Sequence, residues 1–136
     1  MRLKYLLDTN VLIHIRRKHP YVVSKFAGVA KSDLLLSPIS YGELHYGVEK
    51  SLNPARAREV LSALIRQIEV PPITPDVAEV YSRIRASLSR RGLLIGQNDL
   101  WIAAHAMAGD YTLVSDNTRE FERVEGLRLE NWAREA

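Results

Sequence analysis

The sequence predicts a three-layer α/β/α fold with a mainly parallel central sheet. Short apolar runs typical of buried strands alternate with stretches in which apolar residues recur at helical spacing. Such strand–helix–strand units have right-handed crossovers and place helices on both faces of the sheet. The six prolines fall between the expected elements or at their starts, and we find no repeat or linker. Residues 1–136 are therefore expected to form one domain.

The N-terminal part of the chain is expected to contain two strands and two helices. Residues 3–7 form the first apolar run, and a short helix should extend from Thr9 to about Arg17. A second helix is expected near Tyr21–Ala30, with its apolar side made of Val22, Val23, Phe26 and Val29. The triplet Leu34–Leu36 then predicts the second strand.

Three helices are predicted in the middle of the chain, each from its own start signal. Ser40 and Glu43 have capping-box spacing, which predicts that a helix begins here and runs to about Lys50. A cap and a first-turn proline at 53–54 precede an amphipathic helix, whose apolar stripe is Val60, Leu61, Leu64, Ile65 and Ile68. A third helix should run from the Thr-Pro pair at 74–75 to Gly92, after a short edge strand at 70–73.

The C-terminal part is expected to hold one long helix, one helical turn and two strands. Asn98 and Asp99 should begin the helix, which Gly109 ends. The strands are predicted at 111–115 and about 127–129, with the short turn at 118–121 between them.

Four acidic residues stand where apolar runs give way to helices. Asp8 and Asp116 follow expected strands, while Glu43 and Asp99 lie at the expected starts of helices. Ligands bind outside the carboxyl ends of parallel strands, so these side chains are expected to converge. Two carboxylates about 4 Å apart repel by roughly 4 kcal/mol at an effective dielectric of about 20. A cation is therefore expected between them, and oxygen ligands suit Mg²⁺ or Mn²⁺.

Each acid also has a purely structural explanation. Asp8, Asp99 and Asp116 would all suit the first turn or cap of a helix, and Glu43 would complete its capping box. The two explanations are compatible, because a helix N-terminus favours the ionised carboxylate that a metal ion needs.

Composition narrows the function classes. The chain has no cysteine, which excludes disulfides, thiolate zinc sites and a cysteine nucleophile. No apolar run approaches the roughly 20 residues of a membrane span, and no signal peptide is recognisable, so a cytoplasmic location without membrane contact is expected. The net charge of +3 includes basic clusters at Arg16, Arg17 and Lys18 and at Arg90 and Arg91. Such clusters suit either solvated helix faces or the phosphates of a polyanion.

Other catalytic chemistries find no support. The histidines His14, His19, His45 and His105 show no metal-ligand spacing and are interpreted as surface or core residues. The sequence has no Gly-x-Ser-x-Gly elbow, no Walker loop and no Gly-x-Gly-x-x-Gly motif, which argues against serine hydrolysis and nucleotide-loop chemistry.

Four motifs in order span essentially the whole chain, at Leu6–Leu12, Ser40–Gly47, Asn98–Ala106 and Val114–Phe121. Each is weak alone, but together and at this spacing they resemble the PIN-domain ribonucleases, and within them the VapC toxins of toxin–antitoxin modules. The resemblance implies a metal-dependent endoribonuclease that uses Mg²⁺ or Mn²⁺. Its catalytic and metal-binding acids match Asp8, Glu43, Asp99 and Asp116.

The resemblance also implies supporting residues and partners. Asp116 lies at a position that varies among relatives, for which Glu120 is a substitute candidate, and Thr9 and Asn117 match groups that support the acids or position the substrate. Family members form homodimers and are silenced by a VapB-like antitoxin that threads a segment into the active-site groove. The RNA is expected to be a structured one such as tRNA, with mRNA left open.

The expected mechanism is attack by water on the phosphodiester, giving a 3′-hydroxyl and a 5′-phosphate. The ion would be held mainly by Asp8 and Asp99, with Glu43 and Asp116 acting through water or at a second site. The basic residues Arg16, Arg17, Arg90 and Arg91 are expected to position the RNA. Two alternatives stay open: a phosphatase of the haloacid-dehalogenase type, which needs an aspartate where this chain has Asn10, and a non-catalytic nucleic-acid- or partner-binding domain.

Overall fold

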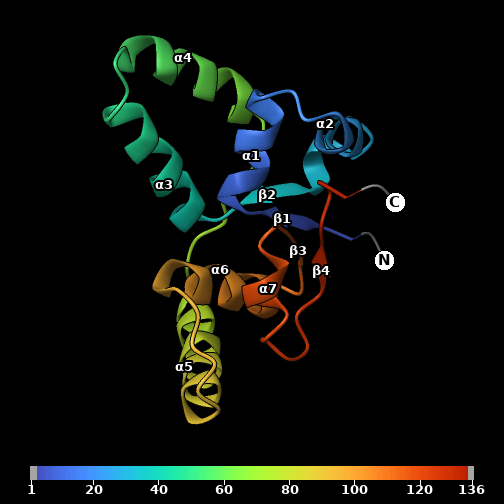
Figure 1. Cartoon of the computed structure of the whole chain (residues 1–136), viewed down its shortest axis with the longest axis vertical. Coiled ribbons are helices and arrows are strands. Elements are labelled where there is room, and N and C mark those ends of the chain that lie inside the picture. Colours follow the sequence, from blue (N-terminus) through green and yellow to red (C-terminus); the bar gives the residue numbers. More distant parts are fainter. Residues whose placement is uncertain (1–2, 135–136) are drawn as a thin grey trace.

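The computed structural model describes residues 3–134 and confirms the predicted three-layer architecture (Figure 1). Its centre is a sheet of four parallel strands in the order β2-β1-β3-β4. The strands are β1 (Tyr5–Leu7), β2 (Leu34–Leu36), β3 (Thr112–Val114) and β4 (Leu129–Glu130). The sequence-predicted strands at 3–7, 111–115 and 127–129 are present with shorter or shifted bounds.

Side chains of the strands alternate between two hydrophobic cores. Leu6 pairs in register with Leu35 on one side and Leu113 on the other, and all three belong to one core. Their neighbours Leu7 and Val114 point to the opposite face and belong to the second core. Burial on both faces explains why the strands read as continuous apolar runs rather than as alternating patterns.

Helices cover both faces of the sheet. On one side lie the helices α1 (Thr9–Arg16), α2 (Pro20–Ala27), α3 (Pro38–Glu49) and α4 (Pro54–Ile65) (Figure 1). The other side carries α5 (Pro75–Arg90), α6 (Gln97–Ala108) and the short α7 (Thr118–Phe121). A short 3-10 helix, η1 (Lys31–Asp33), leads into β2.

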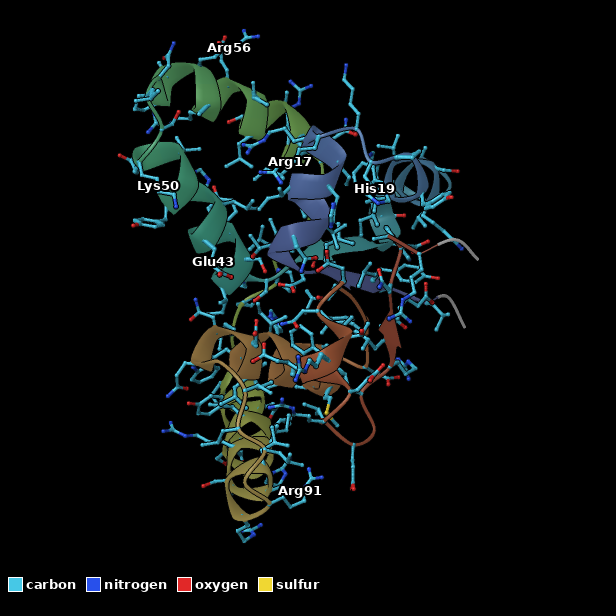
Figure 2. The ribbon with its side chains drawn as sticks, viewed as in Figure 1. Arg17, His19, Glu43, Lys50, Arg56 and Arg91 are labelled. Atoms are coloured by element: carbon cyan, nitrogen blue, oxygen red, sulfur yellow. The ribbon has the colours of Figure 1, made fainter. Side chains whose placement is uncertain are left out.

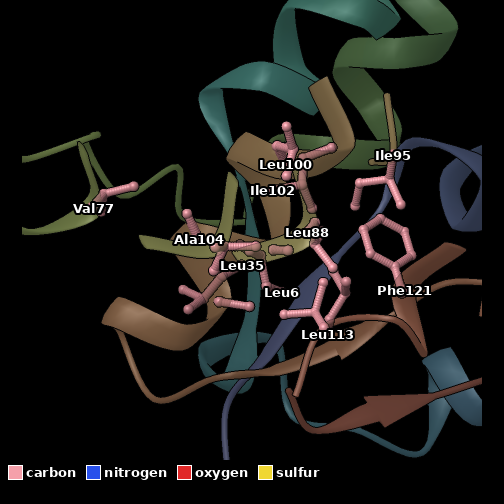
Figure 3. Packing of buried hydrophobic residues seen from close by; sticks show 14 residues of the cluster. Leu6, Leu35, Val77, Leu88, Ile95, Leu100, Ile102, Ala104, Leu113 and Phe121 are labelled. Carbon is pink, nitrogen blue, oxygen red and sulfur yellow. The ribbon is translucent and has the colours of Figure 1, made fainter. Parts of the chain in front are cut away.

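The core between the sheet and α6 fixes the helix that carries Asp99. Leu100 and Ile102 of α6 and Phe121 of α7 are almost completely buried against Leu6 and Leu113 (Figure 3). Burying a side chain of this size contributes roughly 1.5–3 kcal/mol, so α6 is held firmly beside the strands. Asp99, next to Leu100 in the first turn, is thereby placed near the sheet edge.

The predicted capping box at Ser40 and Glu43 is wrong. Helix α3 begins earlier, at Pro38, with Ser37 as the cap whose Oγ accepts a hydrogen bond from the Ile39 amide. Pro38 suits the first position of a helix, because the N–H groups of the first turn have no carbonyl acceptor within the helix and proline lacks this N–H. Ser40 is instead buried inside the helix, and its hydroxyl has no hydrogen-bond partner. Glu43 is therefore free of the capping role and available to other groups.

The predicted edge strand at 70–73 is also wrong. In this region only an isolated bridge between Leu35 and Glu69 extends the sheet, with the Leu36 amide donating to the Glu69 carbonyl at 2.9 Å. Pro71 and Pro72 lack the N–H groups that a ladder would need. Helix α6 begins one residue before the predicted Asn98, with Gly96 as its cap.

The parallel topology brings three chain segments to one edge of the sheet. Asp8 follows β1, Ser37 and α3 follow β2, and residues 115–117 follow β3. No helix within residues 3–134 is long and apolar enough to cross a membrane.

Candidate active site

Asp8 lies at the centre of the site and is 5% exposed. It caps α1, with one carboxylate oxygen accepting from the Thr9 amide at 2.8 Å. Its other oxygen accepts from the Ser115 hydroxyl at 2.8 Å and from the Asn10 side-chain amide at 3.3 Å. The structural explanation given by the sequence, a helix cap, is thus correct for Asp8 and compatible with a functional role.

Ser115 ties the segment after β3 to the start of α1. This buried hydroxyl donates to Asp8 and accepts from the Asn10 side chain at 3.3 Å and from the Asn117 amide at 3.0 Å. One donor and two acceptor positions are a complete set for a serine hydroxyl. The network therefore fixes the orientation of the Asp8 carboxylate.

Glu43 reaches the site from α3. Its Oε1 accepts a hydrogen bond from the Thr9 hydroxyl at 2.9 Å, so Thr9 bridges Asp8 and Glu43 through its amide and its side chain. His105 of α6 helps to set the position of α3, because its Nδ1 lies 3.2 Å from the Oγ of the cap residue Ser37. Burial lowers the pKa of His105, and a hydrogen bond to the Pro72 carbonyl opposes this effect. The interpretation of His105 as a core residue is confirmed.

Asp99 forms a group with Asn117 and Glu120. The Asn117 side-chain amide lies 3.4 Å from a carboxylate oxygen of Asp99 and donates to Glu120 at 2.7 Å. Asp99 and Glu120 interact as a carboxyl pair, and each shifts the pKa of the other. Two neighbouring carboxyl groups no longer repel each other as like charges when one of them holds a proton.

The pKa values show which group holds that proton. Burial, followed by the hydrogen bond to Glu120, raises the pKa of Asp99 to about 7. The hydrogen bond from Asp99, followed by that from Asn117, lowers the pKa of Glu120. Asp99 is therefore the group of the pair that takes up the proton below a pH of about 7, while Glu120 stays ionised.

Negative charges act on each other throughout the site. Burial raises the pKa of Asp8, hydrogen bonds from Ser115 and Thr9 partly offset that rise, and the charges of Glu43 and Asp116 increase it. The charges of Asp8 and Glu43 likewise raise the pKa of Asp99. Asp8, Glu43 and Asp99 thus share one electrostatic field, although they come from three separate segments.

Asp116 faces α1. Its Oδ2 is 2.6 Å from Nε2 of His14, and its amide lies 3.4 Å from Oδ1 of Asn10. Since a carboxylate only accepts, Nε2 of His14 carries the hydrogen. Asn10 and His14 are four residues apart and therefore share a face of α1. The charge of Asp116 helps to raise the pKa of Asp8, and it is not among the main causes of the raised pKa of Asp99.

The four arginines proposed from sequence lie away from the acids. Arg16 and Arg17 are at the end of α1 opposite to Asp8 and Thr9, roughly 10 Å along the helix. Arg90 and Arg91 are at the far end of α5, well away from Glu43 (Figure 2). Arg91 donates to the Arg123 carbonyl at 3.2 Å. The structure brings together the acids, Thr9 and Asn117, and keeps these arginines at the periphery.

Sequence reasoning missed Asn10, His14 and Ser115 as parts of the site. Asn10 and Ser115 were inside the motifs, and their side chains connect the acids rather than add to them. The i,i+4 spacing of Asn10 and His14 was the available signal, but it gives no hint of a partner 102 residues away. Within residues 3–134, no three acidic or histidine side chains stand in a ready-made ion-binding cluster.

Comparison with known proteins agrees with this arrangement. The PIN domain family model matches residues 5–127. "Ribonuclease VapC2" of Haemophilus influenzae is 43% identical over 131 residues, which cover 96% of this chain and 98% of the relative. "tRNA(fMet)-specific endonuclease VapC" of Salmonella typhimurium is 38% identical over 130 residues, which cover 96% and 98%.

Solved structures show the same fold. The crystal structure of DNA-bound VapBC from Salmonella typhimurium has a chain that matches with a TM-score of 0.89 at 38% identity, over 96% of this chain and 99% of that one. VapBC2 from Rickettsia felis, bound to a promoter DNA fragment, matches with a TM-score of 0.88 at 34% identity and the same coverage. The protein therefore belongs to the PIN-domain family and, within it, to the VapC ribonucleases.

Proposed function

We propose that this protein is an endoribonuclease toxin that hydrolyses RNA phosphodiester bonds with the help of Mg²⁺ or Mn²⁺. The observation that carries the proposal is the shared electrostatic field of Asp8, Glu43 and Asp99 at the carboxyl edge of the sheet. Among the described residues 3–134, no lysine or arginine forms an ion pair with any of these three acids. A cluster without its own cation is suited to an external one.

The donor set fits a hard divalent cation. All candidate ligands are carboxylates, namely Asp8, Glu43, Asp99 and Asp116, with Glu120 as a fifth acid beside Asp99. Mg²⁺ and Mn²⁺ prefer such oxygen ligands. Because the acids do not form a ready-made cluster, binding an ion would require side chains to turn inward. Asp99 would also have to release its proton.

The protein's own groups would prepare the reaction. Ser115, Asn10 and the Thr9 amide hold the Asp8 carboxylate in one orientation, and the Thr9 hydroxyl holds Glu43. Asn117 positions the Asp99 and Glu120 carboxylates. A bound divalent ion supplies activation of water and stabilisation of negative charge on the phosphate. Direct attack by water would leave a 3′-hydroxyl and a 5′-phosphate.

Substrate and partner are proposed by similarity. A relative from Salmonella typhimurium is named for initiator tRNA, which makes a structured RNA the first candidate substrate. The peripheral arginines Arg16, Arg17, Arg90 and Arg91 would contact phosphates outside the acid cluster. Relatives of known structure are VapBC complexes, and we propose that a VapB-like antitoxin silences this protein by covering the acids, and that the protein forms a homodimer.

Purified protein with Mg²⁺ is expected to cut an initiator tRNA transcript, or total cellular RNA, at a small number of sites. Sequencing the new ends should show 5′-phosphates and 3′-hydroxyls, because water attacks in place of the neighbouring 2′-hydroxyl. The Asp8→Asn protein is the matched control for contaminating nucleases. A 2′,3′-cyclic phosphate would contradict attack by water, and intact RNA under all conditions would favour the non-catalytic binding domain.

The proton that Asp99 takes up predicts how metal binding depends on pH. Since the pKa of Asp99 is about 7, apparent Mn²⁺ affinity should fall as pH is lowered from about 8 to 6. Glu120→Gln removes a negative charge that raises this pKa, so the fall should move to lower pH. Asp116→Asn should shift the midpoint less, because Asp116 is not among the main causes of the raised pKa of Asp99. Titration calorimetry at several pH values would measure the midpoint. An equal shift in both variants would refute this account.

A further inference from the structure

A row of three aromatic rings leads away from Asp116 along the connection between α1 and α2. The His14 ring, which holds Asp116, meets the edge of the His19 ring at a centroid distance of 5.0 Å. The His19 ring in turn lies 5.8 Å from the Tyr21 ring. The row therefore connects an acid of the site to the outer surface.

Tyr21 is the open end of this row. It is 43% exposed, an unusual state for a large ring on a helix that buries its apolar side with Val22 and Phe26. The packing of α2 does not require an exposed tyrosine, because Val22 and Phe26 already fill the core. An exposed ring beside a catalytic cluster is available for stacking with a flat partner.

Positive charges flank the ring. Lys25 lies four residues after Tyr21 and so on the same face of α2, and its side chain is exposed. The preceding turn carries exposed Arg17 and Lys18, with Lys18 in the left-handed conformation at φ 61°. Asp116 contacts this row of rings through His14. This acid belongs to the candidate active site itself.

This combination fits a single strand of RNA. Single-stranded nucleic acids bind where aromatic rings stack on bases and cations follow the phosphates. A row of rings that begins at a catalytic acid would hold the nucleotides next to the cleaved bond. The arginines at the far end of α5, Arg90 and Arg91, would contact phosphates.

We propose that Tyr21, supported by His19 and His14, is a base-stacking platform that holds the single-stranded RNA beside the cleavage site, with Lys25 and the 17–18 turn on its phosphates. The proposal rests on the ribonuclease function proposed above. It adds a specificity surface outside the acid cluster. Tyr21 and His19 contact the substrate or each other, and His14 positions Asp116.

The test measures RNA binding in an Asp8→Asn background, so that cleavage does not interfere. The probe is a fluorescein-labelled single-stranded RNA of about 16 nucleotides, long enough for one such site. Tyr21→Ala should weaken binding roughly tenfold without changing the salt dependence, because stacking releases no counterions. Lys25→Gln should lower the salt slope by about 0.7, the value for one phosphate contact on a single strand.

Conservative variants separate a lost ring from a damaged fold. Tyr21→Phe keeps the ring and should retain binding within about twofold. His19→Asn keeps a cap for α2, since asparagine replaces the ring nitrogen that accepts from the Val22 amide, but should weaken binding. Melting temperatures identify any unfolded variant. Arg128→Gln, a surface arginine paired with Asp110, is the charge control and should leave the salt slope unchanged.

The outcomes distinguish the two proposals. If the native protein cuts no RNA, the ribonuclease function fails. If it cuts RNA but Tyr21→Ala binds the probe as well as its parent, or Tyr21→Phe is as weak as Tyr21→Ala, the platform is refuted. Normal RNA binding by Tyr21→Ala together with lost binding of a co-expressed antitoxin would also overturn it, since the surface would then serve a protein partner.

Discussion

Replacing Asp8 with asparagine is expected to reduce RNA cleavage at least about 10³-fold while the protein stays folded. Asp8 is the acid on which the charges of both Glu43 and Asp116 act, and its hydrogen bonds from Ser115 and Thr9 hold it in place. Loss of a carboxylate ligand removes several kcal/mol of charge stabilisation in the transition state, and 1.36 kcal/mol corresponds to a factor of ten. Rates on the same RNA under identical metal concentrations would measure the effect.

Thermal unfolding of the metal-free proteins provides the control for Asp8→Asn. Asparagine keeps an oxygen acceptor for the α1 cap, so we expect a melting temperature equal to or above that of the wild type. A variant that still cleaves RNA at the wild-type rate would remove Asp8 from the catalytic set. A variant that is inactive because it is unfolded would leave Asp99→Asn as the decisive substitution.

Asp99→Asn adds a pH signature to the same test. The folded pKa of Asp99 is about 7, above its ordinary value of 3.8, so the folded state binds the proton more tightly than the unfolded state. The contribution of Asp99 to the free energy of unfolding is therefore fully present at low pH and is lost as pH rises from about 4 to 7. The metal-free variant should gain melting temperature over the wild type at pH 8, with the difference vanishing near pH 4. A gain that is independent of pH would contradict this assignment.

Removing divalent metal is expected to have the second large effect, a complete loss of cleavage in EDTA that Mg²⁺ or Mn²⁺ restores. In the described part of the chain, Asp8, Glu43 and Asp99 have no lysine or arginine ion-pair partner, so the ion should also stabilise the folded protein. At a concentration of about 100 times Kd, binding adds about 2.7 kcal/mol by mass action, which raises the melting temperature by several degrees.

The melting-temperature response provides a readout that does not depend on RNA. Asp8→Asn should lose most of the metal-induced rise, whereas Arg128→Gln should keep it, because Arg128 is paired with Asp110 rather than with an acid of the site. Ca²⁺ would serve to compare a larger ion with the same ligands, because Mg²⁺ demands a tighter geometry. Cleavage that survives exhaustive chelation would rule out the metal-dependent mechanism.

The sequence by itself determined the layers of the fold and the acids of the site. Apolar triplets such as Leu34–Leu36 indicate strands buried on both faces, and their alternation with helical stretches predicts a parallel sheet. The strand order β2-β1-β3-β4 was decided by the tertiary structure. Asp8 was recognisable because an aspartate directly after such a strand both caps a helix and faces the ligand side of the sheet.

Helix starts were less certain, because a start signal is local and several can compete. Ser40 and Glu43 have the right spacing for a capping box, but Ser37 followed by Pro38 provides a cap and a first-turn proline three residues earlier. The earlier start prevails, and Glu43 then lies one turn inside α3 with its carboxylate on Thr9. In the same way, Pro71 and Pro72 ended strand pairing after Glu69.

Only the tertiary structure decided which side chains support each acid. The hydrogen bonds from Ser115 to Asp8 and from His14 to Asp116 join residues more than 100 positions apart, and no local pattern encodes such a pair. The same holds for the pairing of Asp99 with Glu120 and of Asp116 with His14. These contacts depend on how far α1, α6 and the segment after β3 approach one another, which core packing sets and the spacing of residues along the chain does not.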